Sequence, residues 1–264
     1  DERPPDVGPH SIWWAHYDAW STYWRRLSWL MTDIDLHAET AVLCRNRDLC
    51  PDTVRPLFER QIGFQYIPES YFPACTVEDG ALWLHGHRYT AVLGDKALFP
   101  DAAHPEVSAL EPDCRCDPPQ PMLRCASFNK EGRACWLLVN EGNTPIKTRL
   151  TLPVDAPLCR YDLWNGQPCT CPAERTAKGA CLPLELPARG SLLLFTCTAR
   201  ESEALPLPPT YLSLAAPAFA LADEDAAHLT KTYRATLQIT ATELQTATPL
   251  LTLPGQEMAE LTVN

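Results

Sequence analysis

Glycine is scarce in this chain, with 11 residues among 264, below the usual share of about 7%. The motifs that depend on glycine are missing as well: there is no G-x-S-x-G, no phosphate-binding loop and no dinucleotide-binding fingerprint. Such motifs place a nucleophile or hold a phosphate through special backbone turns. Taken on its own chemistry, the sequence therefore shows no active site.

Basic residues are also few: the chain has 22 Lys and Arg and 33 Asp and Glu, which gives a net charge of −11. An acidic surface repels phosphate backbones, and no stripe of basic residues interleaved with aromatics offsets it, so nucleic-acid binding is disfavoured. No apolar run approaches the ~18 residues that a membrane-spanning helix needs. The N-terminus shows no basic region followed by an apolar core, so no signal peptide is visible.

Proline is the residue in excess, with 26 copies, about twice the usual ~5%. Each proline fixes φ and removes a backbone donor, which disfavours a mostly helical bundle and favours short elements. The prolines concentrate at 4–9, 100–121 and 206–217, which we interpret as seams between domains. The chain starts at Asp1 without a Met and stops at Asn264, and we expect it to be a piece of a longer protein.

The twelve cysteines have two interpretations. An even number suggests a disulfide framework, but such frameworks belong to small secreted domains without a sufficient core. Several cysteines lie inside apolar runs, as at 134–137, where a free thiol acts as a small hydrophobe. Because nothing else indicates export, we favour free thiols and a cytoplasmic location, with export of a parent protein left open.

No cofactor or metal is expected. Cys114-x-Cys116 and Cys169-x-Cys171 lack the two-residue gap of a zinc knuckle. His85-Gly-His87 offers two imidazoles with no third ligand nearby, so a turn with two solvated histidines is the better interpretation.

An aromatic helix is predicted after a proline-rich lead-in at 1–11, with Ser11 as its N-cap. Large apolar side chains recur with steps of four and three, as on one face of a helix of about five turns. They are Trp13, Tyr17, Trp20, Trp24, Leu27 and Met31. Five tryptophans lie within 13–29, so this helix must dock against something substantial.

The first ~100 residues alternate strand and helix patterns, which indicates part of an open α/β layer with parallel strands. Residues 40–44 and 89–93 read as buried strands, and 64–67 and 82–84 as shorter ones. Pro51 opens a second amphipathic helix and Gly63 ends it. Residues 68–72 form a short helical turn, and 100–121 are interpreted as a linker.

From residue 122 the helical period disappears, and short strands separated by turn signals predict an antiparallel β-sandwich. The six predicted strands are 122–128, 134–140, 147–152, 158–163, 181–186 and 191–196. Residues 200–229 read as a connection. Further strands at 233–240, 250–253 and 259–263 begin another β unit that has too few strands to close.

Candidate sugar-contacting residues lie at the start of the chain: His10, Trp13, Trp14, His16 and Tyr17. Aromatic faces stack on the C–H face of sugar rings. For Trp13 and Tyr17, on the predicted stripe, seating the helix is the favoured role, whereas His10 and Trp14 stay open. Carboxylates such as Glu141 and Asp162 could form an acid/base pair, but their turn-like contexts favour caps and turn formers.

One stretch, PPDVGPHSIWWAHYDAWSTYWRRLSWLM followed by TAVLC, resembles a known family. It is similar to the region after the catalytic barrel in large bacterial glycoside hydrolases of the α-L-rhamnosidase type (glycoside hydrolase family 106 and relatives). Residues 134–142, 161–166 and 184–195 resemble the β-sandwich that follows there. Residues 233–264 resemble the opening of the galactose-binding-like jelly roll that such enzymes carry.

The resemblance implies a fold of three parts. These are the aromatic helix with a shortened flavodoxin-like domain at 1–112, a β-sandwich at 113–199, and a linker with an incomplete galactose-binding-like domain at 200–264. It implies a non-catalytic accessory portion that packs on an upstream barrel holding the paired carboxylates, so no catalytic residue is carried over. His10, Trp13 and Trp14 are at most sugar contacts. A stand-alone carbohydrate-binding or scaffold module and a cysteine-based metal or redox protein are the alternatives.

Overall fold

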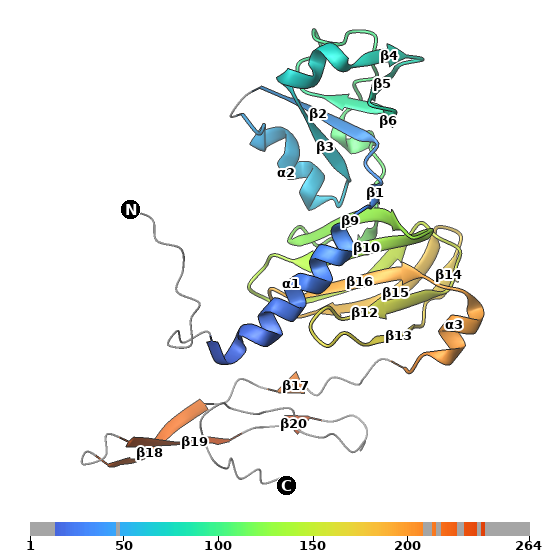
Figure 1. Cartoon of the computed structure of the whole chain (residues 1–264). Helices are drawn as coiled ribbons and strands as arrows, with labels where there is room; N and C mark the ends of the chain where they lie inside the picture. The colour runs from blue at the N-terminus through green and yellow to red at the C-terminus, as the bar shows by residue number, and fades with distance from the viewer. Residues whose placement is uncertain are drawn as a thin grey trace. The chain divides into compact units, whose positions relative to one another are not determined.

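The computed structural model describes residues 14–45 and 48–207 in full, and the backbone of four strands between 213 and 240. The chain divides into two units, at 1–208 and 209–264. Among the residues that are described, no helix is long and apolar enough to cross a membrane. The first unit contains an α/β layer, a β-sandwich and one long helix (Figure 1).

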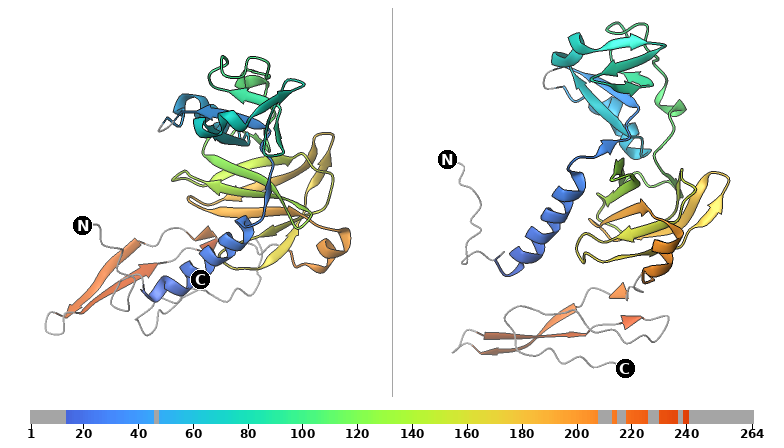
Figure 2. Two further views of the ribbon diagram at one scale, coloured as in Figure 1. Left: turned by 45° about the horizontal axis from the view of Figure 1, so that its top comes forward. Right: turned by 45° about the vertical axis from the view of Figure 1, so that its right-hand side comes forward.

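The α/β layer is built on three parallel strands in the order β3-β2-β7. Every residue of β2 is buried, as expected for a central parallel strand. A small antiparallel sheet, β4-β5-β6, continues the layer, and both views in Figure 2 show α2 beside the parallel strands. The bounds are β2 Thr40–Cys44, α2 Pro51–Glu59, β3 Phe64–Pro68, η2 Glu69–Ala74, β4 Thr76–Glu78, β5 Ala81–Leu84, β6 His87–Tyr89, β7 Ala91–Leu93 and η3 Val107–Ala109.

Two predicted boundaries in this layer are wrong. The apolar run 89–93 is not one strand, because the chain turns at Thr90 and passes from β6 to β7. The Glu39 carbonyl accepts the N–H groups of both Thr90 and Ala91, at 2.9 and 3.2 Å, and this fixes the corner. Helix α2 ends at Glu59, four residues before Gly63, because Gln61 takes a positive φ of 55°.

The sandwich consists of a six-stranded and a four-stranded antiparallel sheet. The first has the order β1-β9-β10-β16-β12-β13 and the second β14-β15-β11-β8. Their facing sides share one core, to which Trp136 and Leu138 contribute from β10 and Leu150 from β11. The bounds are β1 Asp35–Leu36, β8 Arg115–Asp117, β9 Leu123–Lys130, β10 Arg133–Asn140, β11 Ile146–Leu152, β12 Leu158–Tyr161, β13 Pro168–Cys171, β14 Glu174–Thr176, β15 Gly179–Leu186 and β16 Ser191–Thr196.

All six predicted strands of this region are present, with ends shifted by at most two residues. Four short strands of the sandwich were not predicted: β8, β13, β14 and β1. The first lies inside the stretch interpreted as a linker, where proline masks the strand pattern, yet it pairs with β11 through Cys116 and Leu150. A helix not predicted from the sequence, α3 (Ala199–Ala204), follows β16 and begins with a capping box formed by Thr198 and Glu201.

Helix α1 (Tyr17–Met31), preceded by the short helix η1 (Trp14–His16), lies against the outer face of the six-stranded sheet. It contacts that face through Tyr23, Leu27 and Leu30, which pack with Phe128 and Leu163. The predicted apolar stripe is only partly used: Leu27 is half-buried, whereas Tyr17, Trp20, Trp24 and Met31 are exposed. Within the described residues, the docking expected for this helix therefore involves only part of the stripe.

In the second unit the structure describes only strand backbones. Strand β17 (Ser213–Leu214) pairs with β20 (Ile239–Thr240), and β18 (Ala218–Asp225) pairs with β19 (Thr230–Thr236), both antiparallel. Residues 200–229 are thus more than a connection, since they include most of α3 and all of β17 and β18. The strands predicted at 250–253 and 259–263 lie outside the described residues.

Candidate functional site

Four aromatic side chains form a continuous exposed row on η1 and α1, which we call the aromatic ridge: Trp14, Tyr17, Trp20 and Trp24. The three tryptophans are 47–49% exposed. Successive rings contact each other, with centroids 5.6, 5.8 and 6.1 Å apart. Contiguous exposed apolar surface of this kind marks an interaction site in soluble proteins.

The helix has two apolar faces because its large residues span more than one side. Residues 23, 27 and 30 follow steps of four and three and point at the sheet, while the ridge lies on the neighbouring side, since each residue turns the helix by about 100°. The sheet packs against one side of the helix only. The other keeps its aromatic rings exposed.

The middle of helix α1 is attached to the sandwich by ring stacking and hydrogen bonds. Tyr23 stacks on Trp164 with ring centroids 4.3 Å apart, and its hydroxyl lies 3.1 Å from Ser191 Oγ. Arg26 donates to the carbonyls of Leu163 and Trp164 at 2.7 and 2.6 Å. These contacts fix the helix, and so the ridge is presented on a rigid support.

Glycine is required where Arg26 meets the β12–β13 connection. Gly166 has a φ of 69°, and a Cβ there would lie 2.2 Å from the Arg26 guanidinium. The Asn-Gly turn signal at 165–166 therefore serves the attachment of α1 as well as the turn itself.

Of the predicted sugar-contacting residues, Trp14 and Tyr17 lie in the aromatic ridge and His16 caps α1 without a side-chain capping bond. His10 and Trp13 lie outside the described residues. Trp20 and Trp24, which sequence reasoning assigned to the buried stripe, are the ridge members that it missed as candidates. Their spacing was the available signal, but spacing does not tell which apolar side meets the sheet.

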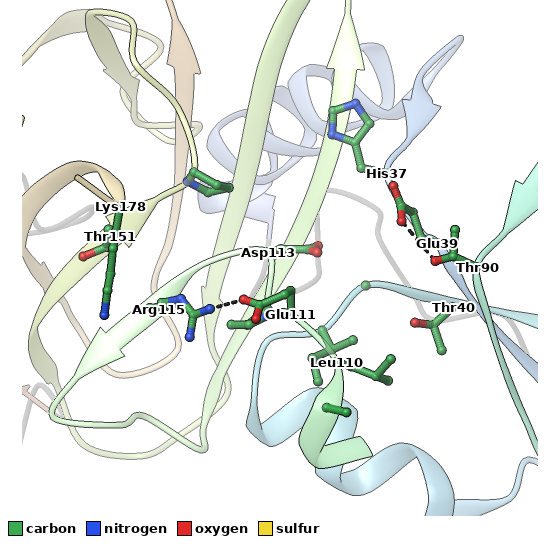
Figure 3. A pocket seen from close by; sticks show the side chains of 15 residues that line it. His37, Glu39, Thr40, Thr90, Leu110, Glu111, Asp113, Arg115, Thr151 and Lys178 are labelled. Carbon is green, nitrogen blue, oxygen red and sulfur yellow. Dashed lines mark hydrogen bonds and ion pairs between the residues drawn. The ribbon is translucent and has the colours of Figure 1, made fainter. Parts of the chain in front are cut away.

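A second candidate is the junction cleft, a cavity of about 680 Å³ between the α/β layer and the sandwich. Figure 3 shows its polar side chains, among them Glu39, Thr90, Asp113, Arg115 and Lys178. Arg115 is paired with Glu111 inside the cleft. No Trp, Tyr or Phe is among its described lining residues, so the cleft offers no aromatic face on which a sugar ring could stack.

Asp113 is the unusual group of the junction cleft. Burial raises its pKa to about 7, assisted by nearby Glu39 and opposed by the Gly63 N–H, which donates to the carboxyl group. Its Oδ2 is buried and has no hydrogen-bond partner among the described residues. The Asp113 side chain lines the cleft, but its Oδ2 is shielded from a ligand bound there.

The backbone around Asp113 explains why its carboxyl group packs closely against Gly63. A Cβ on Gly63 would lie 2.7 Å from Asp113 Oδ2 and from the His37 carbonyl, so only glycine allows this approach. The N–H of Asp113 donates to the Gln61 carbonyl at 2.8 Å. Gln61, itself buried, donates its amide to the carbonyls of Gln120 and Leu123 at 3.1 and 3.0 Å. This network joins the layer to the sandwich.

The other candidates singled out in the sequence occupy structural positions. His85 and Gly86 both have positive φ in the β5–β6 turn, and His87 Nε2 lies 3.0 Å from the Ala38 carbonyl. Glu141 is paired with Arg124 at 2.8 Å. Asp162 accepts the Trp164 N–H at 2.8 Å, as a turn former does. Within the described part of the chain, no group of three or more His, Cys, Asp or Glu side chains is placed to hold a metal ion.

Comparison with known proteins rests on structure, since no protein-family model and no curated protein matches the chain. The rhamnosidase from Novosphingobium sp. PP1Y is similar with a TM-score of 0.57 and 11% identity, over 83% of this chain and 28% of that chain. The likeness shows the fold alone. The β-galactosidase from Bacillus circulans sp. alkalophilus matches with a TM-score of 0.38 and 11% identity, over 72% of this chain and 46% of that chain. That score is too low to carry an argument.

This protein therefore has a mixed, mostly β fold that is also present in part of a glycoside hydrolase. It spans little more than a quarter of the length of that rhamnosidase. Fold alone does not assign an activity, because unrelated functions share folds.

Proposed function

We propose that this chain is a non-catalytic accessory portion of a glycoside hydrolase. The parent enzyme would hydrolyse O-glycosidic bonds, with α-L-rhamnosides of plant polysaccharide as the first candidate substrates. Support comes from the fold likeness to a rhamnosidase over 83% of this chain and from the motifs around the aromatic helix. The carboxylate chemistry of glycoside hydrolysis would reside elsewhere in the parent.

The aromatic ridge is the observation that carries the proposal. It would pack on a catalytic barrel that precedes this chain in the parent enzyme. The rings run from Trp14 on η1 to Trp24 on α1, and the α-helical part from Tyr17 to Trp24 alone advances about 10 Å at 1.5 Å per residue. A protein groove fits such a row, because large apolar rings gain most when they are fully removed from water.

The ring geometry favours a protein partner over a sugar. Tyr17 and Trp20 are tilted by 50°, and Trp20 and Trp24 by 78°. Rings at such angles interlock with neighbouring side chains, whereas a sugar-binding platform presents several flat faces in one plane. Only Trp14 and Tyr17 are nearly parallel, at 13°.

The finer assignment of the fold belongs to the same proposal. Residues 1–112 would comprise the aromatic helix and a shortened flavodoxin-like domain, residues 113–199 the accessory sandwich, and residues 200–264 a linker with the first part of a galactose-binding-like jelly roll. The parallel order β3-β2-β7 is compatible with the first assignment. The antiparallel pair β18–β19 is compatible with the last.

The first prediction is that the purified chain hydrolyses no glycoside. Incubated with an aryl α-L-rhamnoside, it should release no aryl alcohol above the buffer rate, because the paired carboxylates that glycoside hydrolysis needs would lie in the barrel of the parent enzyme. Turnover that follows the chain through purification would contradict the proposal.

A stand-alone carbohydrate-binding module is the second candidate, favoured by the nearly parallel pair Trp14 and Tyr17. The same preparation can be titrated with a rhamnose-containing oligosaccharide while tryptophan emission is recorded. Saturable quenching that Trp14→Ala removes would favour this candidate, with contacts from His10 and Trp13 to be tested in turn. Unchanged emission would favour a protein partner as the ligand of the ridge.

A further inference from the structure

Two cysteines at one end of the sandwich lie unusually close together. All twelve cysteines are free thiols in the structure, yet Cys159 Sγ and Cys197 Sγ are only 2.6 Å apart. Non-bonded heavy atoms keep an optimal separation of roughly 3.5–4.0 Å, and sulfur is larger than carbon. A covalent S–S bond is about 2.05 Å, so the pair is nearer to bonding distance than to thiol contact.

The strand register explains why these two side chains meet. Strand β12 pairs with β16 so that Cys159 lies opposite Phe195. The pairing continues past the end of β16, because the Cys197 N–H donates to the Pro157 carbonyl at 2.9 Å. Side chains alternate along a strand, so Cys197 is the diagonal neighbour of Cys159 on the same face. The backbone holds both sulfurs in place on two hydrogen-bonded strands.

Both thiols are shielded from solvent. Cys159 is 0% exposed and Cys197 is 8% exposed, and burial together with the neighbouring Cys197 thiol raises the pKa of Cys159 to about 12. The Arg133–Glu201 ion pair, with an N–O distance of 2.6 Å, lies beside the thiols and ties α3 to β10. The pair thus sits where the chain leaves the sandwich.

We infer that Cys159 and Cys197 form a disulfide bond when the protein is exposed to a small disulfide oxidant such as oxidised glutathione. This inference is independent of the proposed accessory role in a glycoside hydrolase. It revises the interpretation of all cysteines as free thiols, for this pair alone.

The reaction balances as two thiol–disulfide exchanges. The thiolate of Cys197, the more exposed of the two, attacks one sulfur of the oxidant, and one glutathione leaves with the electron pair and takes the proton of Cys197. The thiolate of Cys159 then attacks the Cys197 sulfur, and the second glutathione leaves and takes the proton of Cys159. The two cysteines are oxidised, and the oxidant is reduced to two thiols.

The bond would restrain the segment between β16 and α3, where the chain leaves the sandwich. It would link β12 to the residue that precedes the capping box of α3, closing a loop from 159 to 197. Cross-links of this kind stabilise chiefly by restricting the unfolded chain. The last strand and α3 would therefore resist fraying.

Peptide mapping of the full chain tests the inference directly. The protein is equilibrated with oxidised glutathione, alkylated under denaturing conditions and digested with trypsin. Residues 150–160 and 190–200 form two tryptic peptides that each contain a single cysteine. We expect them to be joined and 2 Da lighter than the sum of the two free peptides, and to separate after reduction. Alkylation of both cysteines in the oxidised sample, or a link of either one to another cysteine, would overturn the inference.

Variants give a second readout. The melting temperature of the oxidised protein should fall by several degrees on reduction, and Cys159→Ala and Cys197→Ala should each abolish this redox-dependent shift. Cys135→Ala is the matched control, since Cys135 is buried on β10 and also lies opposite Phe195. It should retain the shift, and an equal loss in the control would contradict the assignment to this pair.

Discussion

Asp113 shows how a single buried carboxyl can make the junction of two layers sensitive to pH. Its pKa is raised to about 7, above the ~3.9 of an unfolded Asp. The folded state therefore binds more protons than the unfolded state between these values. The stabilising contribution is fully present below pH ~4 and is lost as pH rises through about 7.

Asp113→Asn should remove this dependence, because the amide is never charged and can still accept the Gly63 N–H. At pH 8 the variant should be more stable than the parent chain by on the order of 1–3 kcal/mol, and the difference should shrink at lower pH. Urea unfolding at pH 5 and pH 8 measures it. Glu111→Gln, an exposed carboxyl of the same cleft, is the control and should leave the profile unchanged; identical profiles for Asp113→Asn and the parent would contradict the account.

Sequence reasoning could not find Asp113, since it lies in a proline-rich stretch that reads as linker. Its environment comes from Gly63, fifty residues earlier, and from His37, whose carbonyl also approaches Gly63. Distant contacts of this kind leave no local pattern. By contrast, the turn roles of His85 and Asp162 are local, and the preference for turns at those positions agrees with the structure.

Helix α1 has a structural role on one side and an exposed candidate interaction surface on the neighbouring side. Its sheet-facing side anchors it, and the aromatic ridge on the neighbouring side is exposed. The sequence predicted the helix and its aromatic content, and its steps of four and three were consistent with either side facing the sheet. Which side is buried depends on the outer face of β9, β10 and β16, which the helix sequence does not encode.

Leu30→Ala should loosen this anchor. Leu30 is 3% exposed and packs in the cluster beneath α1, and emptying such a position costs about 2–5 kcal/mol. Chemical unfolding followed by tryptophan emission measures the loss. Met31→Ala, at the adjacent exposed position, should stay within about 0.5 kcal/mol of the parent, and equal effects of the two substitutions would contradict the packing described.

Strands were the most predictable elements, because alternation and turn residues are local signals. The six main sandwich strands follow from them, whereas β1, β8, β13 and β14 are only two to four residues long, and β8 and β13 also contain cysteine. The break between β6 and β7 also escaped prediction. It depends on Glu39, which accepts a hydrogen bond from the Thr90 hydroxyl across a separation of 51 residues.

At the scale of the whole molecule, the described residues combine a mostly β fold with an exposed aromatic ridge. The fold is shared with a segment of a rhamnosidase, and proline is concentrated at the junctions of its parts. The proposal assigns the ridge to a partner surface on the parent enzyme. Its central claim is that the ridge, rather than any other exposed aromatic, makes that contact.

The most direct test measures the affinity of this chain for the polypeptide encoded immediately upstream of it, by titration calorimetry. The parent chain should bind, and Trp20→Ser with Trp24→Ser should weaken binding by at least about 30-fold, equivalent to ~2 kcal/mol, as for buried tryptophan anchors. Trp29→Ser is the control, since Trp29 is 60% exposed on the same helix but lies outside the ridge, under Lys130. It should change the affinity by less than about 3-fold; absence of binding, or equal losses in both variants, would contradict the account.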